Sequence, residues 1–379
     1  MSRAGPLAAF GKATRKALVL WHEQLLARKD ASQPAILLEF VDDESRPETA
    51  AERFVELARR IHIAVGPYGS QLTAAVMPVC REAGLPLLVP SAGDPNLDLR
   101  GPEGNPPIGF SLLPSNTESL TGAVDWAAAR GIGDVALLFR AEPFSQQAAG
   151  GARGRARELG LHIQWDLTYS SAAEIWEIAF KHEGDRVGLL LGGGYVPGTE
   201  AAGFLPDARE IAIAFERIAE WKALLVAPTF PEFGEALGPR AEGILRNTNW
   251  KPWFPWPGNE AFVSAYRQRW GEEPDNHAAA AYAAGQLIEA AWKRVHVVGP
   301  MGRRGRRGPI GSTEPGCSED DLLSARLALR RVLADLETVT VFGPFAVDGS
   351  GRQSAHSNIL LQWRDGQLRP VDVPGFIHT

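Results

Sequence analysis

Apolar residues recur along the chain with two different spacings. Between Leu7 and Arg28 they return every three to four positions, which predicts an amphipathic helix. Three short apolar runs follow, at Ala35–Val41, Ile61–Val65 and Pro86–Ser91, and each predicts a buried strand. The helical patterns between these runs cover residues 47–60 and 71–83. Strand and helix therefore alternate, as they do around parallel sheets.

The same alternation starts again after residues 108–113. Helices are predicted at residues 116–130, 144–159, 172–182 and 201–220, and strands at 134–139, 162–169, 186–191 and 223–226. Later helical patterns cover residues 259–270, 277–294 and 318–336, and Val339–Phe342 with Ile359–Trp363 predict a hairpin around the turn Asp348–Gly351. The predicted fold class is α/β, with two doubly wound parallel-sheet lobes and a boundary near Pro114–Ser115.

Composition and charge narrow the class of partner. The 379 residues are 45% hydrophobic and 22% charged, which is typical of a globular protein. The net charge of −6 argues against nucleic acid as the main partner. The spacing of Cys80 and Cys317 does not require a disulfide, and Cys80 lies in an apolar helical pattern. The eight histidines form no metal-ligand pattern, so neither a metal nor a cofactor is predicted.

The sequence carries none of the common motifs of α/β enzymes. Gly192-Gly193-Gly194 suggests a nucleotide loop but lacks the GxGxxG spacing. No predicted strand is followed by a P-loop lysine or a nucleophile elbow. The carboxylates of Asp42 and Asp43 suggest either metal or acid–base chemistry, or a solvated turn. A non-catalytic protein is therefore predicted, with an enzyme on the same fold as the alternative.

The sequence shows no segment that would place the chain in or across a membrane. No run approaches the ~18 apolar residues of a membrane span. The residues from Met1 to Leu7 lack the apolar segment of ~7–15 residues that a secretory signal needs. The expectation is a cytosolic chain or one whose start is incomplete.

The run Gly66-Pro67-Tyr68-Gly69-Ser70 joins a strand end to a helix start. The apolar run stops at Val65, and a helical pattern begins directly behind Ser70. The first N–H groups of a helix have no partner within it, and the helix dipole adds partial positive charge there. Ligands of open α/β sheets collect at such strand ends, so the loop is a candidate site for a carboxylate or phosphate. The alternative is that Ser70 only caps the helix.

Several short motifs occur in an order and spacing that resemble those of one family. They are Gly5-Pro6 with Phe10-Gly11, Asp42-Asp43 with Pro47–Ala50, Gly66–Ser70, Ala83–Pro86, Ala278–Gly285, Thr340–Phe345, and Gln362-Trp363 with Asp365-Gly366. Together they span nearly the whole chain. The sequence resembles the type I periplasmic solute-binding proteins of ABC transporters, in the leucine/isoleucine/valine-binding group.

The resemblance implies two lobes joined by three crossovers. Lobe 1 would hold residues 1–114 and 230–337 and lobe 2 residues 115–229 and 338–379, with hinges near Pro114, Pro228 and Glu337. A small amino acid, amide or carboxylate ligand would bind between the lobes and pass to a membrane permease. This implies a periplasmic or cell-surface protein without catalytic residues. The family also contains cytosolic amide-responsive regulators, which are the alternative function.

The resemblance also implies the ligand-binding residues. Backbone N–H groups and Ser70 would hold a carboxylate, and further contacts would come from Tyr68, Ser91, Ala92, Gly93, Phe144, Tyr195 and Thr229. Gly93 stands where branched-chain amino acid binders carry a hydroxyl for the ligand's amino group. Thr229 lies near the place of that group's acidic partner. Recognition of a carboxylate is therefore expected, without a strong requirement for an α-amino group.

The resemblance further implies an apolar strand ahead of the segment Ser2–Pro6. In the family this strand lies in the middle of the first lobe's sheet, between the strands that match Ala35–Val41 and Ile61–Val65. The expectation is that the functional form of the protein begins upstream of Met1.

Overall fold

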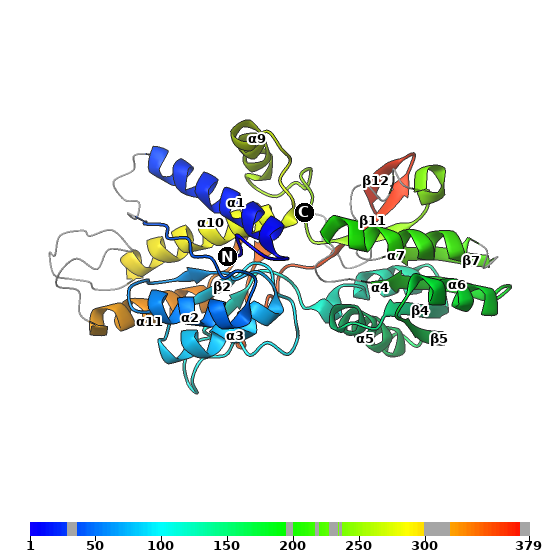
Figure 1. Cartoon of the computed structure of the whole chain (residues 1–379), viewed down its shortest axis with the longest axis horizontal. Helices are drawn as coiled ribbons and strands as arrows, with labels where there is room; N and C mark the ends of the chain where they lie inside the picture. The colour runs from blue at the N-terminus through cyan, green and yellow to red at the C-terminus, as the bar shows by residue number, and fades with distance from the viewer. Residues whose placement is uncertain are drawn as a thin grey trace. The chain divides into compact units, whose positions relative to one another are not determined.

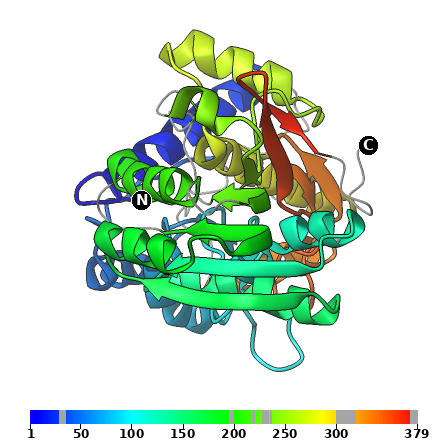
Figure 2. The same cartoon turned by 90° about the vertical axis from the view of Figure 1, so that its right-hand side faces the viewer.

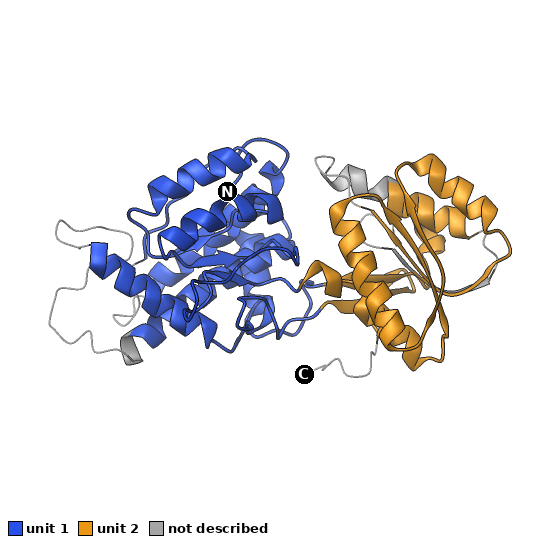
Figure 3. Ribbon diagram, turned by 90° about the horizontal axis from the view of Figure 1, so that it is seen from below, with its two compact units in different colours: residues 1–114, 249–357 blue, residues 115–248, 358–379 orange. Residues whose placement is uncertain are grey.

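The computed structural model describes residues 1–28, 36–194, 200–216, 220–226, 234, 237–298 and 319–371. The chain divides into two compact units, which Figure 3 shows in blue and orange. Unit 1 holds residues 1–114 and 249–357, and unit 2 holds residues 115–248 and 358–379.

The chain crosses between the units after Pro114, Thr248 and Ser357. The family resemblance implies that the second and third crossings lie earlier, near residues 230 and 337. Strand β8 (Leu245–Thr248) pairs within the sheet of unit 2. Phe342 and Phe345 are buried in the core of unit 1. These contacts explain why residues 230–248 belong to unit 2 and residues 338–357 to unit 1.

Unit 1 is built around a parallel sheet in the order β1 (Ala64–Val65), β2 (Leu87–Val89) and β3 (Gly109–Ser111). Its helices are α1 (Ala8–Ala27), α2 (Pro47–Leu57), α3 (Ser70–Glu82), α9 (Asn259–Trp270), α10 (Asn276–Val298) and α11 (Glu319–Ala334). Figure 1 shows α1 and α10 on one side of β2, and α2 and α3 on the other. The pleat explains both layers, because Leu88 packs towards α1 and α10 while Leu87 and Val89 pack towards α2 and α3.

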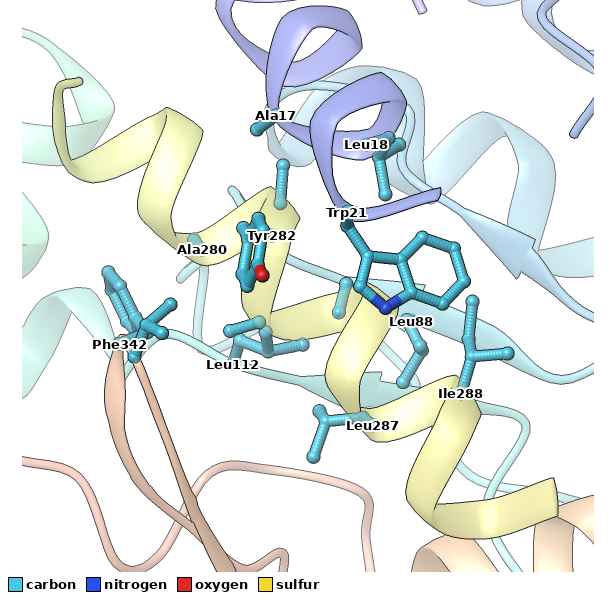
Figure 4. Close-up of a cluster of buried hydrophobic side chains, with 14 of the residues drawn as sticks. Ala17, Leu18, Trp21, Leu88, Leu112, Ala280, Tyr282, Leu287, Ile288 and Phe342 are labelled. Carbon is cyan, nitrogen blue, oxygen red and sulfur yellow. The ribbon is translucent and has the colours of Figure 1, made fainter. Parts of the chain in front are cut away.

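The core of unit 1 is densest where α1 crosses α10. Trp21 of α1 is fully buried, and it lies beside Leu88 and Ile288 in Figure 4. A Cβ atom on Gly285 of α10 would approach Trp21 Cδ2 to 2.3 Å. Gly285 therefore allows the indole ring to lie directly on the helix backbone, and a larger residue there would force the helices apart.

The strand predicted at Ala35–Val41 does not form over residues 36–41, the part of it that the structure describes. Ile36 makes an isolated bridge, and residues 37–43 carry no regular secondary structure. The apolar residues there satisfy the composition of a strand, but a strand also needs a neighbour whose backbone groups pair with its own. Among the described residues, β1 has β2 as its sole neighbour in the sheet.

Unit 2 contains a seven-stranded sheet (Figure 2). Its order is β12 (Gln367–Pro370), β11 (Ile359–Arg364), β8, β7 (Glu220–Val226), β6 (Arg186–Gly193), β4 (Asp134–Arg140) and β5 (His162–Tyr169). The strands from β8 to β5 are parallel, while β11 and β12 run antiparallel to their neighbours. This confirms the predicted α/β class.

Helices cover both faces of this sheet. They are η1 (Asn116–Glu118), α4 (Thr121–Ala129), α5 (Pro143–Glu158), α6 (Ala172–Lys181), α7 (Glu200–Phe215) and η2 (Gly238–Ala241). Along β4, Val135, Leu137 and Phe139 pack with α4 and α5, whereas Ala136 and Leu138 pack with α6 and α7. The continuous apolar run in β4, residues 135–139, is therefore explained by burial on both faces.

The predicted pairing of Val339–Phe342 with Ile359–Trp363 is wrong. The structure instead pairs β9 (Thr338–Thr340) with β10 (Gly343–Phe345) in unit 1. In unit 2, β11 pairs with β12 across Asp365 and Gly366, whose φ angles are 52° and 71°. Two positive φ angles in succession match the twist of a tight hairpin, so this turn makes the hairpin.

Candidate functional site

Helix α3 begins at Ser70 with backbone donors that face away from the helix. Gly69 is the N-cap residue, and no side chain caps the helix. The N–H group of Thr73 bonds Gly69 O at 3.1 Å. Within the described parts of the chain, the N–H groups of Ser70, Gln71 and Leu72 have no acceptor. The reading of Ser70 as the N-cap is therefore wrong, and the first turn keeps three free donors.

Two glycines shape the loop that leads into α3. Gly66 has a φ of 83° and Gly69 a φ of 81°, a region that side chains with a Cβ rarely adopt. The space beside Gly69 is open, since a Cβ atom there would meet nothing within 4 Å. Gly69 is therefore required by its backbone angles, which turn the chain from the loop into α3.

The hydroxyl of Ser70 adds a fourth donor to this turn. Ser70 is partly buried, and its Oγ has no hydrogen-bond partner among the described residues. Together with the helix dipole, three N–H groups and one hydroxyl form a site suited to a carboxylate or phosphate. Thr73, one turn further, is different because its Oγ1 donates to Gly69 O at 2.8 Å.

An aromatic cluster lies beside this turn. Tyr68 stacks on Phe10 of α1, with 4.3 Å between ring centroids and 2° between planes. The Tyr68 hydroxyl lies 3.4 Å from Nε2 of His277 in α10, and both rings meet the His277 ring edge-on. Burial lowers the pKa of His277, while Asp275 acts in the opposite direction. The imidazole is therefore neutral at pH 7, and the cluster offers ring faces rather than a charge.

Sequence reasoning named Tyr68 but missed Phe10 and His277 as site residues. Phe10 appeared there as one of the residues of the predicted first helix, and His277 at the start of a later one. An aromatic residue one turn into a helix and a histidine at a helix start were the available signals. Neither predicts on its own that α1 and α10 meet the loop at Tyr68.

The residues Ser91, Ala92 and Gly93 follow β2 as predicted. Since β1 and β2 are adjacent parallel strands, their following loops lie at the same edge of the sheet. Ala92 and Gly93 are buried and Ser91 is partly buried. Ala92 O accepts a bond from the Ser111 hydroxyl at 3.4 Å. The loop therefore contributes mainly backbone to this edge.

The carboxylates of Asp94 and Asp275 in unit 1 accept hydrogen bonds from within the protein. Asp94 Oδ1 accepts bonds from both the backbone N and Nδ2 of Asn96, at 2.8 and 3.1 Å. Asp275 Oδ1 caps α10 by accepting from Ala278 N at 2.7 Å. These carboxylates stabilise a turn and a helix start, which leaves the edge around Ser70 rich in donors.

In unit 2, Phe144 lies in the first turn of α5, behind strand β4. Here Glu142 caps the helix, because its carboxylate accepts from Phe144 N at 2.8 Å and from Ser145 N at 2.7 Å. Phe144 is partly buried. The predicted site residues Tyr195 and Thr229 lie outside the described residues.

An ion pair between Arg140 and Asp207 lies at the end of β4 in unit 2. Arg140, the last residue of β4, donates from Nε and NH2 to the carboxylate of Asp207 at 2.6 and 3.1 Å. The hydroxyl of Tyr169, at the end of β5, bonds the same carboxylate at 3.2 Å, and burial raises the pKa of Tyr169. A Cβ atom on Gly194 would meet this group at 2.5 Å from the hydroxyl. The cluster fixes the ends of β4 and β5 and the start of the segment that follows β6.

A family model described as periplasmic binding protein matches residues 1–367. The chain belongs to the periplasmic binding protein family. The fold of this periplasmic binding protein is the type I fold, since its α/β units match solved structures of that kind.

Three solved structures illustrate the likeness. A putative branched-chain amino acid ABC transporter from Rhodospirillum rubrum has a TM-score of 0.73 and 19% identity, over 98% of this chain and 97% of that one. An ABC transporter solute-binding protein from R. palustris, in complex with benzoate, has a TM-score of 0.69 and 19% identity, over 98% and 93%. LivJ of Streptococcus pneumoniae, in complex with isoleucine, has a TM-score of 0.68 and 19% identity, over 97% and 95%.

The family is one of binding proteins, so its members bind a solute rather than transform it. Within the described ranges, no three His, Cys, Asp or Glu side chains gather in a way that would hold a metal ion. No helix in the described part of the chain has the length and hydropathy needed to cross a membrane.

Proposed function

We propose that this periplasmic binding protein is the solute-binding component of an ABC transporter and that its ligand is a small organic carboxylate. The first turn of α3 carries the proposal. Its three N–H groups and the Ser70 hydroxyl have no acceptor among the described residues, and the space beside Gly69 is open. Hydrogen bonds to a charged group contribute about 1.5–3 kcal/mol each, so this turn supplies the main polar contact.

The body of the ligand is apolar, and aromatic ligands fit best. Phe10 and Tyr68 present stacked rings next to the donor turn, and burial keeps His277 neutral beside them. Asp94 and Asp275 are held in internal hydrogen bonds, and Gly93 offers no side chain for an amino group. Among the related structures, one binds benzoate and another 3,4-dihydroxybenzoic acid. Aromatic carboxylates are therefore the first ligands to test.

Phe144 and Tyr195 are proposed to complete the site from unit 2, with Thr229 near its edge. Closure of the two units over the ligand would bend the chain at its three crossings, after Pro114, Thr248 and Ser357. Hinge segments absorb such changes in a few backbone angles. Small-angle X-ray scattering should give a smaller radius of gyration with ligand than without, and an unchanged radius would contradict closure.

The function is tested by calorimetry on ligand pairs that differ in one group. 3-Phenylpropanoate and phenylalanine differ only in the α-amino group. 3-Phenylpropanoate and its primary amide differ in the head group, which is a charged carboxylate in the first and a neutral carboxamide in the second. We expect the carboxylate to bind at least as tightly as the amino acid. Replacing the carboxylate by the amide should weaken binding by about tenfold, because a neutral acceptor gives about 0.5–1.5 kcal/mol per bond instead of 1.5–3.

A thermal-shift screen with benzoate, 3,4-dihydroxybenzoate, aliphatic amides and amino acids precedes these titrations. A ligand at a hundredfold excess over its Kd stabilises the folded state by about 2.7 kcal/mol, which a melting curve detects easily. Stabilisation by amino acids alone would overturn the proposed ligand class. Export to the periplasm or cell surface and delivery to a membrane permease are the roles that such a component would serve.

A further inference from the structure

The parallel strands β2 and β3 of unit 1 are joined by a long connection without regular structure. Residues 90–108 contain neither a helix nor a strand, although parallel strands are usually joined through a helix. Irregular connections longer than about 12–15 residues are uncommon in compact domains, and those that are ordered usually serve a function. This connection begins with Ser91, Ala92 and Gly93, at the same sheet edge as the start of α3. The contacts that order it therefore bear on ligand binding.

Three arginines from elsewhere in unit 1, Arg81, Arg330 and Arg352, bond the backbone carbonyls of this connection. The bonded carbonyls are Asp98 O and Arg100 O for the first arginine, Pro106 O and Pro107 O for the second, and Asp94 O, Pro95 O and Leu97 O for the third. A guanidinium group carries five N–H donors in a planar fork, so one arginine can hold several carbonyls of a turn at once. Of the three, Arg352 bonds the stretch that directly follows Gly93.

Arg352 holds the turn Asp94–Leu97 from outside the connection. Its NH1 donates to Asp94 O at 3.2 Å, and its NH2 donates to Leu97 O at 2.6 Å and to Pro95 O. Within the turn, Leu97 N donates to Asp94 O at 3.2 Å. The guanidinium group thus bonds three of the four carbonyls of this turn, immediately behind the residues that are expected at the ligand.

The backbone around Arg352 is itself anchored on strand β3. Gly351 O accepts from Ser111 N at 2.9 Å, and a Cβ atom on Gly351 would approach Gly109 O to 2.1 Å. The carboxylate of Asp348 accepts from Arg352 N at 3.0 Å, and Asp348 N donates to Arg352 O at 2.8 Å. The side chain of Arg352 therefore extends from a fixed backbone, and its bonds transfer that order to the connection after β2.

We propose that Arg352 is a positioning residue of the ligand site: it holds the connection after β2 in the conformation in which Ser91–Gly93 contact a ligand bound at the start of α3. The inference rests on the proposed function, because it assigns Ser91–Gly93 to the same site as Ser70. Ala92 and Gly93 carry no polar side-chain atoms, so what they offer a ligand is mainly backbone. Their contribution depends on the conformation of the connection, and Arg352 acts through that conformation rather than by contact with the ligand.

The test compares the parent chain with Arg352→Ala and Arg352→Lys, and Arg81→Ala is the matched control. Hydrogen exchange by mass spectrometry is first measured without ligand at residues 90–97. Arg352→Ala should exchange there about tenfold faster, because the bonds that order the turn are lost. Arg352→Lys should exchange at an intermediate rate, since an ammonium group lacks the planar fork of donors. Arg81→Ala loses bonds to the same connection farther along and should match the parent at residues 90–97.

Calorimetry with 3-phenylpropanoate then measures the consequence for binding. If Arg352→Ala leaves the connection in its binding conformation for about a tenth of the time, the affinity falls about tenfold, since the apparent Kd is the intrinsic Kd divided by that fraction. Bound 3-phenylpropanoate should restore slow exchange at residues 90–97 in this variant, which a merely structural role of the arginine would not produce. Arg81→Ala should bind as tightly as the parent chain, even where its melting midpoint falls as much.

Three results would overturn the proposal. They are unchanged exchange at residues 90–97 in Arg352→Ala, unchanged affinity despite faster exchange, and equal losses of affinity in Arg352→Ala and Arg81→Ala. Failure of the parent chain to bind 3-phenylpropanoate would instead contradict the proposed ligand class. The amino acid or amide that stabilises the parent chain in the thermal-shift screen would then replace it in the titrations, and the exchange of the unliganded variants would show whether Arg352 orders the connection.

Discussion

Two helices, α3 in unit 1 and α5 in unit 2, begin directly after parallel strands, and their first turns are satisfied in opposite ways. At α5, Pro143 brings no N–H group, and the Glu142 carboxylate accepts from the next two residues. At α3, Gly69 has no side chain, and the first three N–H groups stay without an acceptor among the described residues. The same strand–loop–helix unit is thus self-capped in one unit and open to an external anion in the other.

The start of α5 contributes to stability, whereas the start of α3 is available for binding. The α5 carboxylate is part of the chain and stabilises unit 2 at all times. The α3 turn gives up that stabilisation, and a ligand carboxylate supplies it on binding. Changes at the start of α3 should therefore alter ligand affinity, and changes at the start of α5 should alter the stability of unit 2.

The largest effect is expected when α3 is given its own carboxylate. Ser70→Asp places a negative charge at the helix start, where it competes with the ligand for the same donors and repels it. Binding of 3-phenylpropanoate should fall by more than about a hundredfold, since at least one charged hydrogen bond of about 1.5–3 kcal/mol is lost along with the favourable charge. Calorimetry measures the affinity. The melting midpoint of the variant should not fall, and tight carboxylate binding by it would contradict the site.

Removal of the hydroxyl alone should have a smaller effect. Ser70→Ala leaves the three N–H groups in place, so we expect a loss of about ten- to a hundredfold in carboxylate affinity. Thr73→Val is the matched control, because it removes a hydroxyl from the same helix whose bond goes to Gly69 O. That variant should lose about 1 kcal/mol of stability and keep its affinity. Similar affinity losses in both variants would indicate a general disturbance of the helix.

The α5 cap should control stability instead. Glu142→Ala removes the acceptor for Phe144 N and Ser145 N, which should lower the free energy of unfolding by about 0.5–2 kcal/mol. Glu142→Gln keeps an oxygen acceptor and should cost less. Urea unfolding of both variants measures the difference. A loss of ligand binding in the calorimeter as large as that of Ser70→Ala would mean that the two helix starts are not functionally distinct.

Regular elements could be predicted from the sequence wherever local pattern and tertiary environment agree. The strand His162–Tyr169 and the helix Asn259–Trp270 have the predicted bounds. Residues 36–41 show the opposite case, because their apolar character is that of a strand while their backbone has no complete partner. The hairpin was predicted around Asp348–Gly351, whereas β11 and β12 form it around Asp365 and Gly366, because the pairing of distant strands is not visible in the local sequence of a turn.

In the candidate site, too, features set by local sequence could be predicted and contacts between distant segments could not. Ser70 and the loop before it were found from the sequence, because strand end, glycine and helix start are local features. The cluster around Tyr68 was not found, since Phe10 and His277 reach it from α1 and α10. The self-capping of α5 by Glu142 was also missed, although Glu142 followed by Pro143 is a local signal for a helix start.

The smallest effect concerns pH and depends on His277. Burial lowers the pKa of His277 below the ordinary value of 6.5, so the folded chain binds no proton there at pH 7. The unfolded chain takes up that proton below about pH 6.5, and the free energy of unfolding therefore falls as the pH drops through this range. Above pH 7 neither state changes. Because the donors of α3 are backbone amides and a hydroxyl, carboxylate affinity should vary by less than about twofold between pH 7 and 8.5.

Calorimetry at three pH values in this window tests the prediction, with His277→Gln as the control that carries no titrating ring. Both proteins should give flat profiles. A tenfold loss of affinity in the parent chain between pH 7 and 8.5, absent from His277→Gln, would mean that the imidazole is a cation when ligand is bound. The carboxylate would then be held by a charge next to Tyr68, and the open start of α3 would no longer be what distinguishes unit 1 from unit 2.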